Sequence, residues 1–390
     1  MRQAFELAGI LRQHGAAHRA AHDLPLQQLR AMRAIETCRT AALGGHVEEC
    51  RQCDFTRIAY NSCRNRHCPK CQGAERAKWL ESRTADLLPV EYFHVVFTIP
   101  EEIARIAYYN KEAVYGILFR SAAETLSTIA ADPKHLGAEP GFFGILHTWG
   151  QNLSHHPHVH FVVPGGGLSP DYNTWIPCRP GFFLSVRVLS RLFRRLFLEQ
   201  LQTAFLGGRL LFPGDIAHLE QQSAFLRYLA PVRKSEWVVY SKPPFGGPQQ
   251  VLAYLGRYTH RTAISNQRIL GADDSTVTFQ WNDYRHKDKT KSRKMTLEAH
   301  EFIRRFLVHT LPPGFQRIRH FGFLANRHRR EKLQRCRELL GQPSPVSDTV
   351  RQAQPAPKPP KPCPKCGKGP VVRVGILPAF HWPNRPPDTP

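Results

Sequence analysis

Two consecutive strand-like segments constrain this chain more than any other feature. Apolar and polar residues alternate over residues 145–151, and residues 158–163 form a second run that begins with His158 and His160. Residues two apart on a β-strand face the same side, so the two imidazoles point to one place while the residue between them faces a core. A hairpin of this kind can hold a divalent metal ion, with Gln151 on the neighbouring strand as a candidate third ligand. The alternative is a half-exposed strand with two polar residues.

The charge of the chain indicates its partner. The 390 residues carry a formal net charge of +23, and 42% of them are hydrophobic. A field of this sign attracts polyanions, so DNA is the expected partner, the alternative being a merely basic soluble protein. The length allows two or three domains. The sequence lacks both a long apolar run and a secretion-signal pattern, which predicts a cytoplasmic protein with no membrane partner.

The cysteines indicate metal sites. Ten cysteines in a chain without a secretion signal are expected to be reduced thiols and metal ligands rather than disulfides. Two Cys-x2-Cys pairs, Cys50/Cys53 and Cys68/Cys71, are separated by fourteen residues. Two such pairs complete a tetrahedral site, so we expect these four thiolates to bind one structural zinc ion.

Further cysteine and histidine residues lie in the same region: Cys38, His46, Cys63 and His67. They either bind a second zinc ion or support the first site and contact phosphates. Arg64 and Arg66 lie between the ligands, which predicts that this region contacts DNA. We therefore assign residues 1–90 to a zinc-binding module that recognises DNA.

A helix that carries nucleophiles is predicted around residue 254. Pro248 is a typical first residue of a helix, and Tyr254 and Tyr258 are four residues apart, so they share one face. Tyrosines at this spacing are usually core or interface residues, but beside a His-x-His metal site they become candidate nucleophiles. A phenol that attacks a phosphodiester forms a phosphotyrosine, which conserves the bond energy for rejoining. The metal ion would polarise the scissile phosphate.

Basic residues in and after this helix are candidate DNA contacts, because lysine and arginine bind the phosphate backbone. They are Arg257, Arg261, Lys287, Lys289, Lys291 and Arg293. Apolar spacing also predicts helices at residues 5–14, 26–37, 101–131 and 184–206. Strand composition predicts strands at residues 91–100, 236–240 and 276–283.

The end of the chain has a different composition. Residues 342–362 are rich in proline and are predicted to form a linker. Cys363 and Cys366 form one more Cys-x2-Cys pair, to which Cys336 is a candidate addition. These cysteines either bind zinc or belong to a loose tail. In both cases we assign residues 336–390 to a proline-rich, basic C-terminal tail.

Five motifs occur in order along the chain: NSCRNRHCPKC at residues 61–71, HTWGQ at 147–151, HPHVH at 156–160, YLGRYTHR at 254–261 and FQRIRHFGF at 315–323. Together they resemble the insertion sequence 91 family of transposases, within the HUH endonuclease superfamily. The resemblance covers about residues 5–335.

The resemblance implies an α+β fold, in which the zinc-binding module precedes an HUH-type central antiparallel sheet flanked by helices. Residues 91–335 would form this catalytic domain, with the two histidines on a central strand. It further implies rolling-circle-like transposition through single-stranded DNA in a bacterial cell, with Mg²⁺ or Mn²⁺ and both tyrosines in the active site. For the third metal ligand Gln151 fits by spacing, and His155 and His260 remain candidates.

Two other functions are compatible with these residues. A replication-initiation or mobilisation nuclease would use the same active site on a plasmid origin. A zinc-dependent DNA-binding regulator would need no catalysis, but the pairing of Tyr254/Tyr258 with His158/His160 argues against it.

Overall fold

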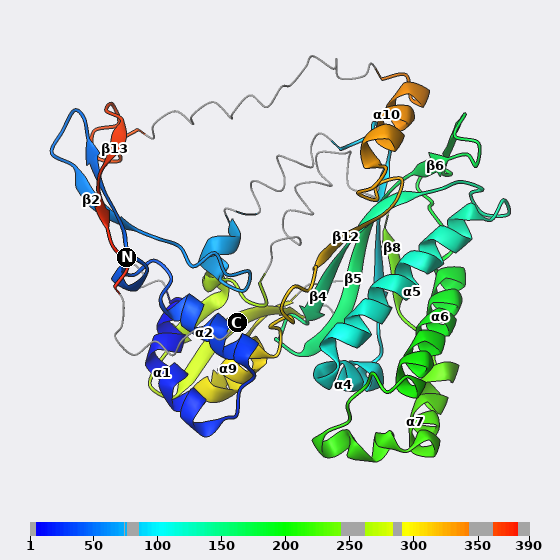
Figure 1. The fold of residues 1–390 in the computed structure, drawn as a ribbon, viewed down its shortest axis with the longest axis horizontal. Helices are drawn as coiled ribbons and strands as arrows, with labels where there is room; N and C mark the ends of the chain where they lie inside the picture. The colour runs from blue at the N-terminus through cyan, green and yellow to red at the C-terminus, as the bar shows by residue number, and fades with distance from the viewer. Residues whose placement is uncertain are drawn as a thin grey trace.

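A five-stranded antiparallel sheet forms the centre of the protein (Figure 1). The structure, a computed structural model, describes residues 5–73, 75, 86–242, 262–283, 291–342 and 362–380. The strands of the sheet stand in the order β12 (Ile318–Gly322), β4 (Gly141–Trp149), β5 (His155–Pro164), β3 (Tyr92–Thr98) and β8 (Val239–Lys242). Neighbouring strands are antiparallel throughout. Because β5 is the middle strand, the prediction that the two histidines lie on a central strand is confirmed.

Alternation along the strands gives the sheet two different faces. Val159, Phe161 and Val163 of β5 belong to the largest apolar core of the protein. Successive side chains of a strand point to opposite faces, so His158 and His160 lie on the other face. β3 and β4 alternate in the same way, and the sheet therefore has one apolar face and one face rich in histidine.

Helices cover the apolar face (Figure 1). They are α4 (Glu101–Tyr109), α5 (Lys111–Ala131), α6 (Val186–Leu206) and α7 (Gln222–Lys234). Aromatic side chains join the layers, since the rings of Phe97 on β3 and Phe193 on α6 are 4.9 Å apart. The helix predicted over residues 101–131 is divided at Asn110, which has a non-helical backbone and whose side chain bonds the backbone of Leu211.

The opposite face of the sheet is covered at one end by α10 (Arg329–Leu339). Leu333 and Cys336 of this helix pack in a smaller core with Phe143 of β4 and Val162 of β5. A short two-stranded sheet, β6 (Gly166–Leu168) with β7 (Trp175–Pro177), follows β5. The sheet flanked by helices that was predicted is thus confirmed.

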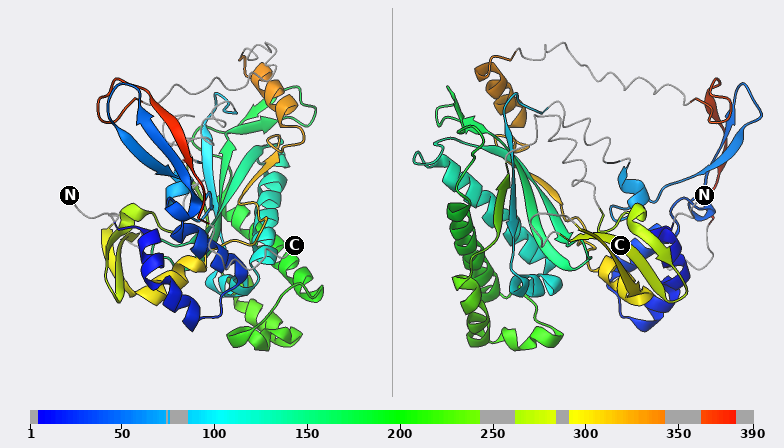
Figure 2. Two further views of the ribbon diagram at one scale, coloured as in Figure 1. Left: turned by 60° about the vertical axis from the view of Figure 1, so that its left-hand side comes forward. Right: turned by 180° about the vertical axis from the view of Figure 1, so that it is seen from behind.

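A second lobe combines the beginning of the chain with a segment far along it (Figure 2). We call it the α1–α9 lobe. Its elements are α1 (Leu7–Ala21), α2 (Leu26–Glu36), β9 (Ile269–Ala272), β10 (Thr276–Asp283), β11 (Lys291–Glu298) and α9 (Ala299–Leu307). The apolar sides of these helices share one core with the three-stranded sheet, and Trp149 and Leu153, at and beyond the end of β4, enter the same core. The two lobes are therefore joined at the end of β4.

A third, smaller sheet projects from the two lobes (Figures 1 and 2). Its strand order is β13 (Val371–Leu377), β1 (Gly45–Cys50) and β2 (Thr56–Tyr60). β13 pairs with β1 from Gly45 opposite Leu377 to Cys50 opposite Val371. The C-terminal segment is thus an integral strand of the N-terminal module, which corrects the alternative of a loose tail.

Several predicted residues fall outside the described part of the chain. These are the candidate nucleophiles and their basic neighbours, Tyr254, Arg257, Tyr258, His260 and Arg261, and two of the lysines, Lys287 and Lys289. Among the residues that are described, none of the helices is both long and apolar enough to cross a membrane.

Two glycines near β12 have left-handed backbones but differ in the space around them. Gly322 has φ +57°, and a Cβ atom there would overlap the carbonyl oxygen of Pro140 just before β4. Gly314 has φ +69°, and a Cβ atom there would meet open space. Both glycines avoid the left-handed strain of other residues, but at Gly322 a side chain would also force the strands apart.

We expect Gly322→Ala to lower the free energy of unfolding by about 1–3 kcal/mol more than Gly314→Ala, because overpacking adds to the shared backbone strain. Thermal unfolding of both variants beside the parent chain measures the difference. Equal unfolding midpoints for the two variants would contradict the close approach of β12 to β4.

Candidate active site and metal centres

Three histidines of the central sheet form one cluster. His147 lies on β4, and His158 and His160 lie on β5, with His147 directly opposite His158 in the strand pairing. The nitrogen atoms that these rings offer all lie within 4.8 Å of one another. The structure thus brings together the two histidines that the sequence singled out, and it adds a third imidazole.

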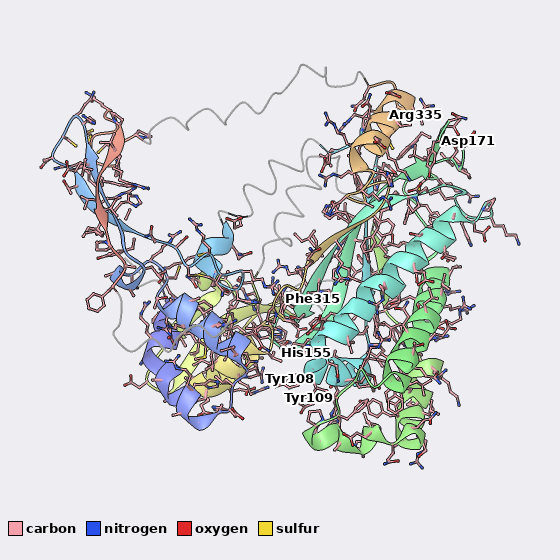
Figure 3. All side chains as sticks on the ribbon, viewed as in Figure 1. Tyr108, Tyr109, His155, Asp171, Phe315 and Arg335 are labelled. Atoms are coloured by element: carbon pink, nitrogen blue, oxygen red, sulfur yellow. The ribbon has the colours of Figure 1, made fainter. Side chains whose placement is uncertain are left out.

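The third member of the cluster differs from the predicted one. Gln151 lies in the turn after β4 and not on the strand itself, so it is not opposite His158. His155 points to the helical face, where its Nε2 is 2.8 Å from the hydroxyl of Tyr115; Figure 3 shows His155 beside Tyr108 at the junction of the lobes. The signal for His147 was present in the alternation of β4, but reading it required the register of the hairpin.

Hydrogen bonds orient the two rings of β5. The Nδ1 of His158 donates to the carbonyl oxygen of His156 at 2.6 Å, because a carbonyl can only accept. Its Nε2 therefore keeps a lone pair. The Nδ1 of His160 is 2.8 Å from the Nε2 of His94 on β3, a contact that the sequence did not predict. Partners of this kind hold metal-binding imidazoles in place.

Burial favours the neutral form of His158. His147 and His160 are 2% and 7% exposed. Burial, followed by the charges of His156 and His94, lowers the pKa of His158 to about 3. A neutral imidazole donates its lone pair to a metal ion, whereas a protonated ring cannot. Three imidazoles fit a first-row transition ion such as Mn²⁺ better than Mg²⁺, which prefers oxygen ligands.

The cysteines form two clusters of four. The first contains Cys38, Cys63, Cys68 and Cys71. Sulfur atoms in this cluster are 3.6 to 3.7 Å apart. Tetrahedral zinc with bonds of about 2.3 Å places its sulfur ligands roughly 3.8 Å apart, so the geometry is that of a closed structural zinc site.

The second cluster contains Cys50, Cys53, Cys363 and Cys366. The Sγ atoms of Cys50 and Cys366 are 3.7 Å apart, as are those of Cys53 and Cys363. This cluster lies at the far end of the β13–β1–β2 sheet, where the C-terminal segment returns to the N-terminal hairpin. It is also a four-thiol site with the spacing of structural zinc.

The predicted pairing of the cysteines was therefore wrong. Cys50/Cys53 and Cys68/Cys71 do not share one zinc ion, because the β1–β2 hairpin carries the first pair away from the second. Cys363 and Cys366 complete the cluster of Cys50 and Cys53. Cys38 and Cys63 complete the cluster of Cys68 and Cys71. Cys336 is buried in the core under α10 instead of joining Cys363.

The two histidines proposed for a second zinc site have other contacts. His46 lies 2.9 Å from the carboxylate of Glu48. The Nε2 of His67 accepts the backbone N–H of Leu311, and burial lowers the pKa of His67 to about 3. Both rings thus contribute to packing and hydrogen bonding within the module, and the second zinc site contains cysteines alone.

The candidate DNA contacts occupy different environments. Arg64 is exposed with a left-handed backbone (φ 53°). Arg66 donates to the carbonyl oxygens of Phe315 and Pro312 at 2.6 and 2.7 Å, so it anchors the module to the segment before β12. Arg293 lies on β11, 3.3 Å from the carboxylate of Asp283. Lys291 begins β11.

A cavity of about 1130 Å³ lies between the α1–α9 lobe and the helices of the central sheet. Basic side chains line it: Lys111, Arg120, Arg209 and Arg304. Two hydrogen bonds to carbonyl oxygens hold the Lys111 ammonium, and burial lowers its pKa to about 8. The sequence did not reveal this cavity, because its walls come from four separate stretches of chain.

Comparisons with known proteins agree with these centres. Residues 141–332 match a family described as "Putative transposase", and residues 10–99 match one described as "Transposase zinc-binding domain". A "Putative transposase y4qJ" of Sinorhizobium fredii (strain NBRC 101917 / NGR234) is 59% identical over 397 residues, covering 100% of this chain and 99% of the relative. The "Transposase for insertion sequence element IS801" of Pseudomonas savastanoi pv. phaseolicola is 28% identical, covering 86% and 77%.

A solved structure of TrwC complexed with a 27-mer DNA is 15% identical, covers 45% of this chain and 68% of the TrwC chain, and gives a TM-score of 0.23. At that score the similarity does not define the fold. The matched families and relatives do define a class, that of transposases with a structural zinc module. Within it, the chain belongs to the insertion sequence 91 family, and the resemblance seen in its sequence is confirmed.

The separation of the two cysteine clusters gives a direct test. We expect Cys366→Ser to retain one zinc ion fewer per chain than the parent after dialysis, because three remaining ligands hold zinc less tightly than four. Cys178→Ser, at a cysteine outside both clusters, should retain the parent zinc content. Elemental analysis of the full-length chains measures both. Unchanged zinc in Cys366→Ser would exclude Cys366 as a zinc ligand and contradict the second cluster.

Proposed function

We propose that this chain nicks and rejoins single-stranded DNA at the ends of a mobile element, and so drives rolling-circle-like transposition. The observation that carries the proposal is the cluster of three imidazoles, His147, His158 and His160, on adjacent central strands. Membership of a transposase family supplies the biological reaction, and the cluster supplies a metal-assisted way to cut a phosphodiester.

The histidines and the tyrosines have different roles in the proposed reaction. The three imidazoles would hold Mn²⁺ or Mg²⁺, which when bound neutralises charge on the scissile phosphate. The hydroxyl oxygen of Tyr254 or Tyr258 forms a bond to phosphorus and gives up its proton. The bond from phosphorus to the 3′ oxygen breaks, which releases a 3′ hydroxyl. The 5′ phosphate stays on the tyrosine until another 3′ hydroxyl attacks it and restores a phosphodiester.

We assign residues 91–335 to this catalysis and the zinc-binding module of residues 1–90 to DNA recognition. Within this module, Arg64 is exposed and is assigned to a phosphate contact. The basic residues near the tyrosines, Arg257, Arg261, Lys287, Lys289, Lys291 and Arg293, are assigned to the DNA backbone on the basis of their sequence context. A replication or mobilisation nuclease would use the same chemistry, but the transposase relatives favour an insertion element as the substrate.

Removing one imidazole tests the metal centre. We expect His147→Ala to slow Mn²⁺-dependent nicking of single-stranded element-end DNA by about 100-fold or more, because the bound metal contributes several kcal/mol of charge stabilisation. His218→Ala, at an exposed histidine of a short 3-10 helix, is the matched control and should nick at the parent rate. Nicking by His147→Ala at the parent rate would exclude His147 as a ligand.

Removing both phenols tests the nucleophiles. The variant Tyr254→Phe/Tyr258→Phe keeps the rings and loses only the hydroxyl groups, so we expect it to form no covalent adduct with labelled element-end DNA on a denaturing gel. Tyr60→Phe, at an exposed tyrosine of β2, should form the adduct as the parent does. An adduct in the double variant would place the nucleophile elsewhere in the chain.

A further inference from the structure

Three histidines outside the active site form a separate cluster in the α1–α9 lobe. His18 lies on α1, His22 follows the last residue of that helix, and His300 is the second residue of α9. The nitrogen atoms that they offer lie within 4.8 Å of one another. The rings of His18 and His22 are stacked at 4.2 Å, and that of His300 is 5.4 Å from His18.

His18 is the unusual member of the cluster. Its side chain is 0% exposed, and neither of its ring nitrogens has a hydrogen-bond partner in the described part of the chain. A buried polar group without a partner costs about 1–3 kcal/mol, and each such group in a folded protein calls for an explanation. An apolar residue would fill the same space without this cost.

A metal ion would provide the missing interaction. A ring nitrogen of an imidazole that carries no proton offers a lone pair, and a metal ion accepts that lone pair.

The geometry of His22 points the same way. Its Nδ1 donates to the backbone carbonyl oxygen of His18 at 3.0 Å, which leaves the lone pair on Nε2. A hydrogen bond of this kind to a carbonyl is the usual support for a metal-binding histidine. The extended backbone of His22 at the end of α1 brings its ring into a stack on that of His18.

We propose that His18, His22 and His300 bind a first-row transition-metal ion, for which zinc is the probe, in a site that clamps α1 to α9. The three nitrogen atoms lie within 4.8 Å of one another. Zinc with bonds of about 2.0–2.1 Å places nitrogen ligands roughly 3.4 Å apart, so the rings would approach slightly on binding the ion. His18 and His22 also line the cavity between the lobes.

The clamp would join two segments that are distant in the chain and already packed together. α1 and α9 share the core of the lobe, and α9 directly follows β11, the strand that carries Arg293. A metal ion at this junction would fix α1, the first helix of the zinc-binding module, against α9, the helix that follows β11. The site is independent of the proposed nicking reaction, because it contains none of its residues.

Zinc content measures the site in the full-length chain. All proteins carry His158→Ala/His160→Ala, so that the active-site cluster contributes no ion. In this background we expect His22→Ala to retain one zinc ion fewer per chain than the parent after incubation with zinc sulfate and dialysis. His22 is exposed, so its loss leaves the core intact. His135→Ala, at an exposed histidine outside the metal clusters of the described residues, should match the parent.

A second variant shows that the ion is shared between the helices. His300→Ala should lose the same single ion, and the combined His22→Ala/His300→Ala variant should lose no more than either alone. Added zinc should raise the thermal unfolding midpoint of the parent and leave that of His22→Ala unchanged, relative to protein dialysed without added zinc. Equal zinc content in His22→Ala, His135→Ala and the parent would overturn the proposal.

Discussion

The alternation of side chains along β5 is the constraint on which the rest of the structure depends. Phe161 packs edge-on against Phe97 and Phe142, with ring centroids 5.8 and 5.3 Å apart. On β4 a Cβ atom at Gly144 would lie 2.5 Å from the Phe161 ring, so the strands interlock in one register. A slip by one residue would exchange the two faces of the strand. The packing that buries Phe161 on the apolar face therefore also places His160 on the face rich in histidine.

Burial then determines what the histidine face can do. The chain carries a net charge of +23, and a cluster of protonated imidazoles inside it would repel cations. Desolvation instead lowers the pKa of His158 to about 3. A neutral imidazole in a basic protein can accept a metal cation while the arginines and lysines of the chain attract DNA phosphates.

The sequence predicted features that depend on local pattern and missed those that depend on long-range contacts. The helices α1 and α2, the strand β3 and the shared face of His158 and His160 follow from periodicity. The pairing of Cys50/Cys53 with Cys363/Cys366 could not be read, since equivalent Cys-x2-Cys pairs are interchangeable until the fold brings two of them together. His147 needed the strand register, and the burial of His67 needed the packing of the segment that includes Leu311.

A short series of contacts connects the cluster of Cys38, Cys63, Cys68 and Cys71 to the histidine-rich face of the central sheet. Arg66, two residues before Cys68, is partly buried and donates to two carbonyl oxygens of the segment that precedes β12. β12 in turn pairs with β4, the strand that carries His147. Without its carbonyl partners the Arg66 guanidinium would be left partly desolvated and unpaired, at a cost of about 1–3 kcal/mol. The thiolate ligands fix the backbone from which Arg66 reaches, so zinc binding stabilises the edge strand that holds His147 in register.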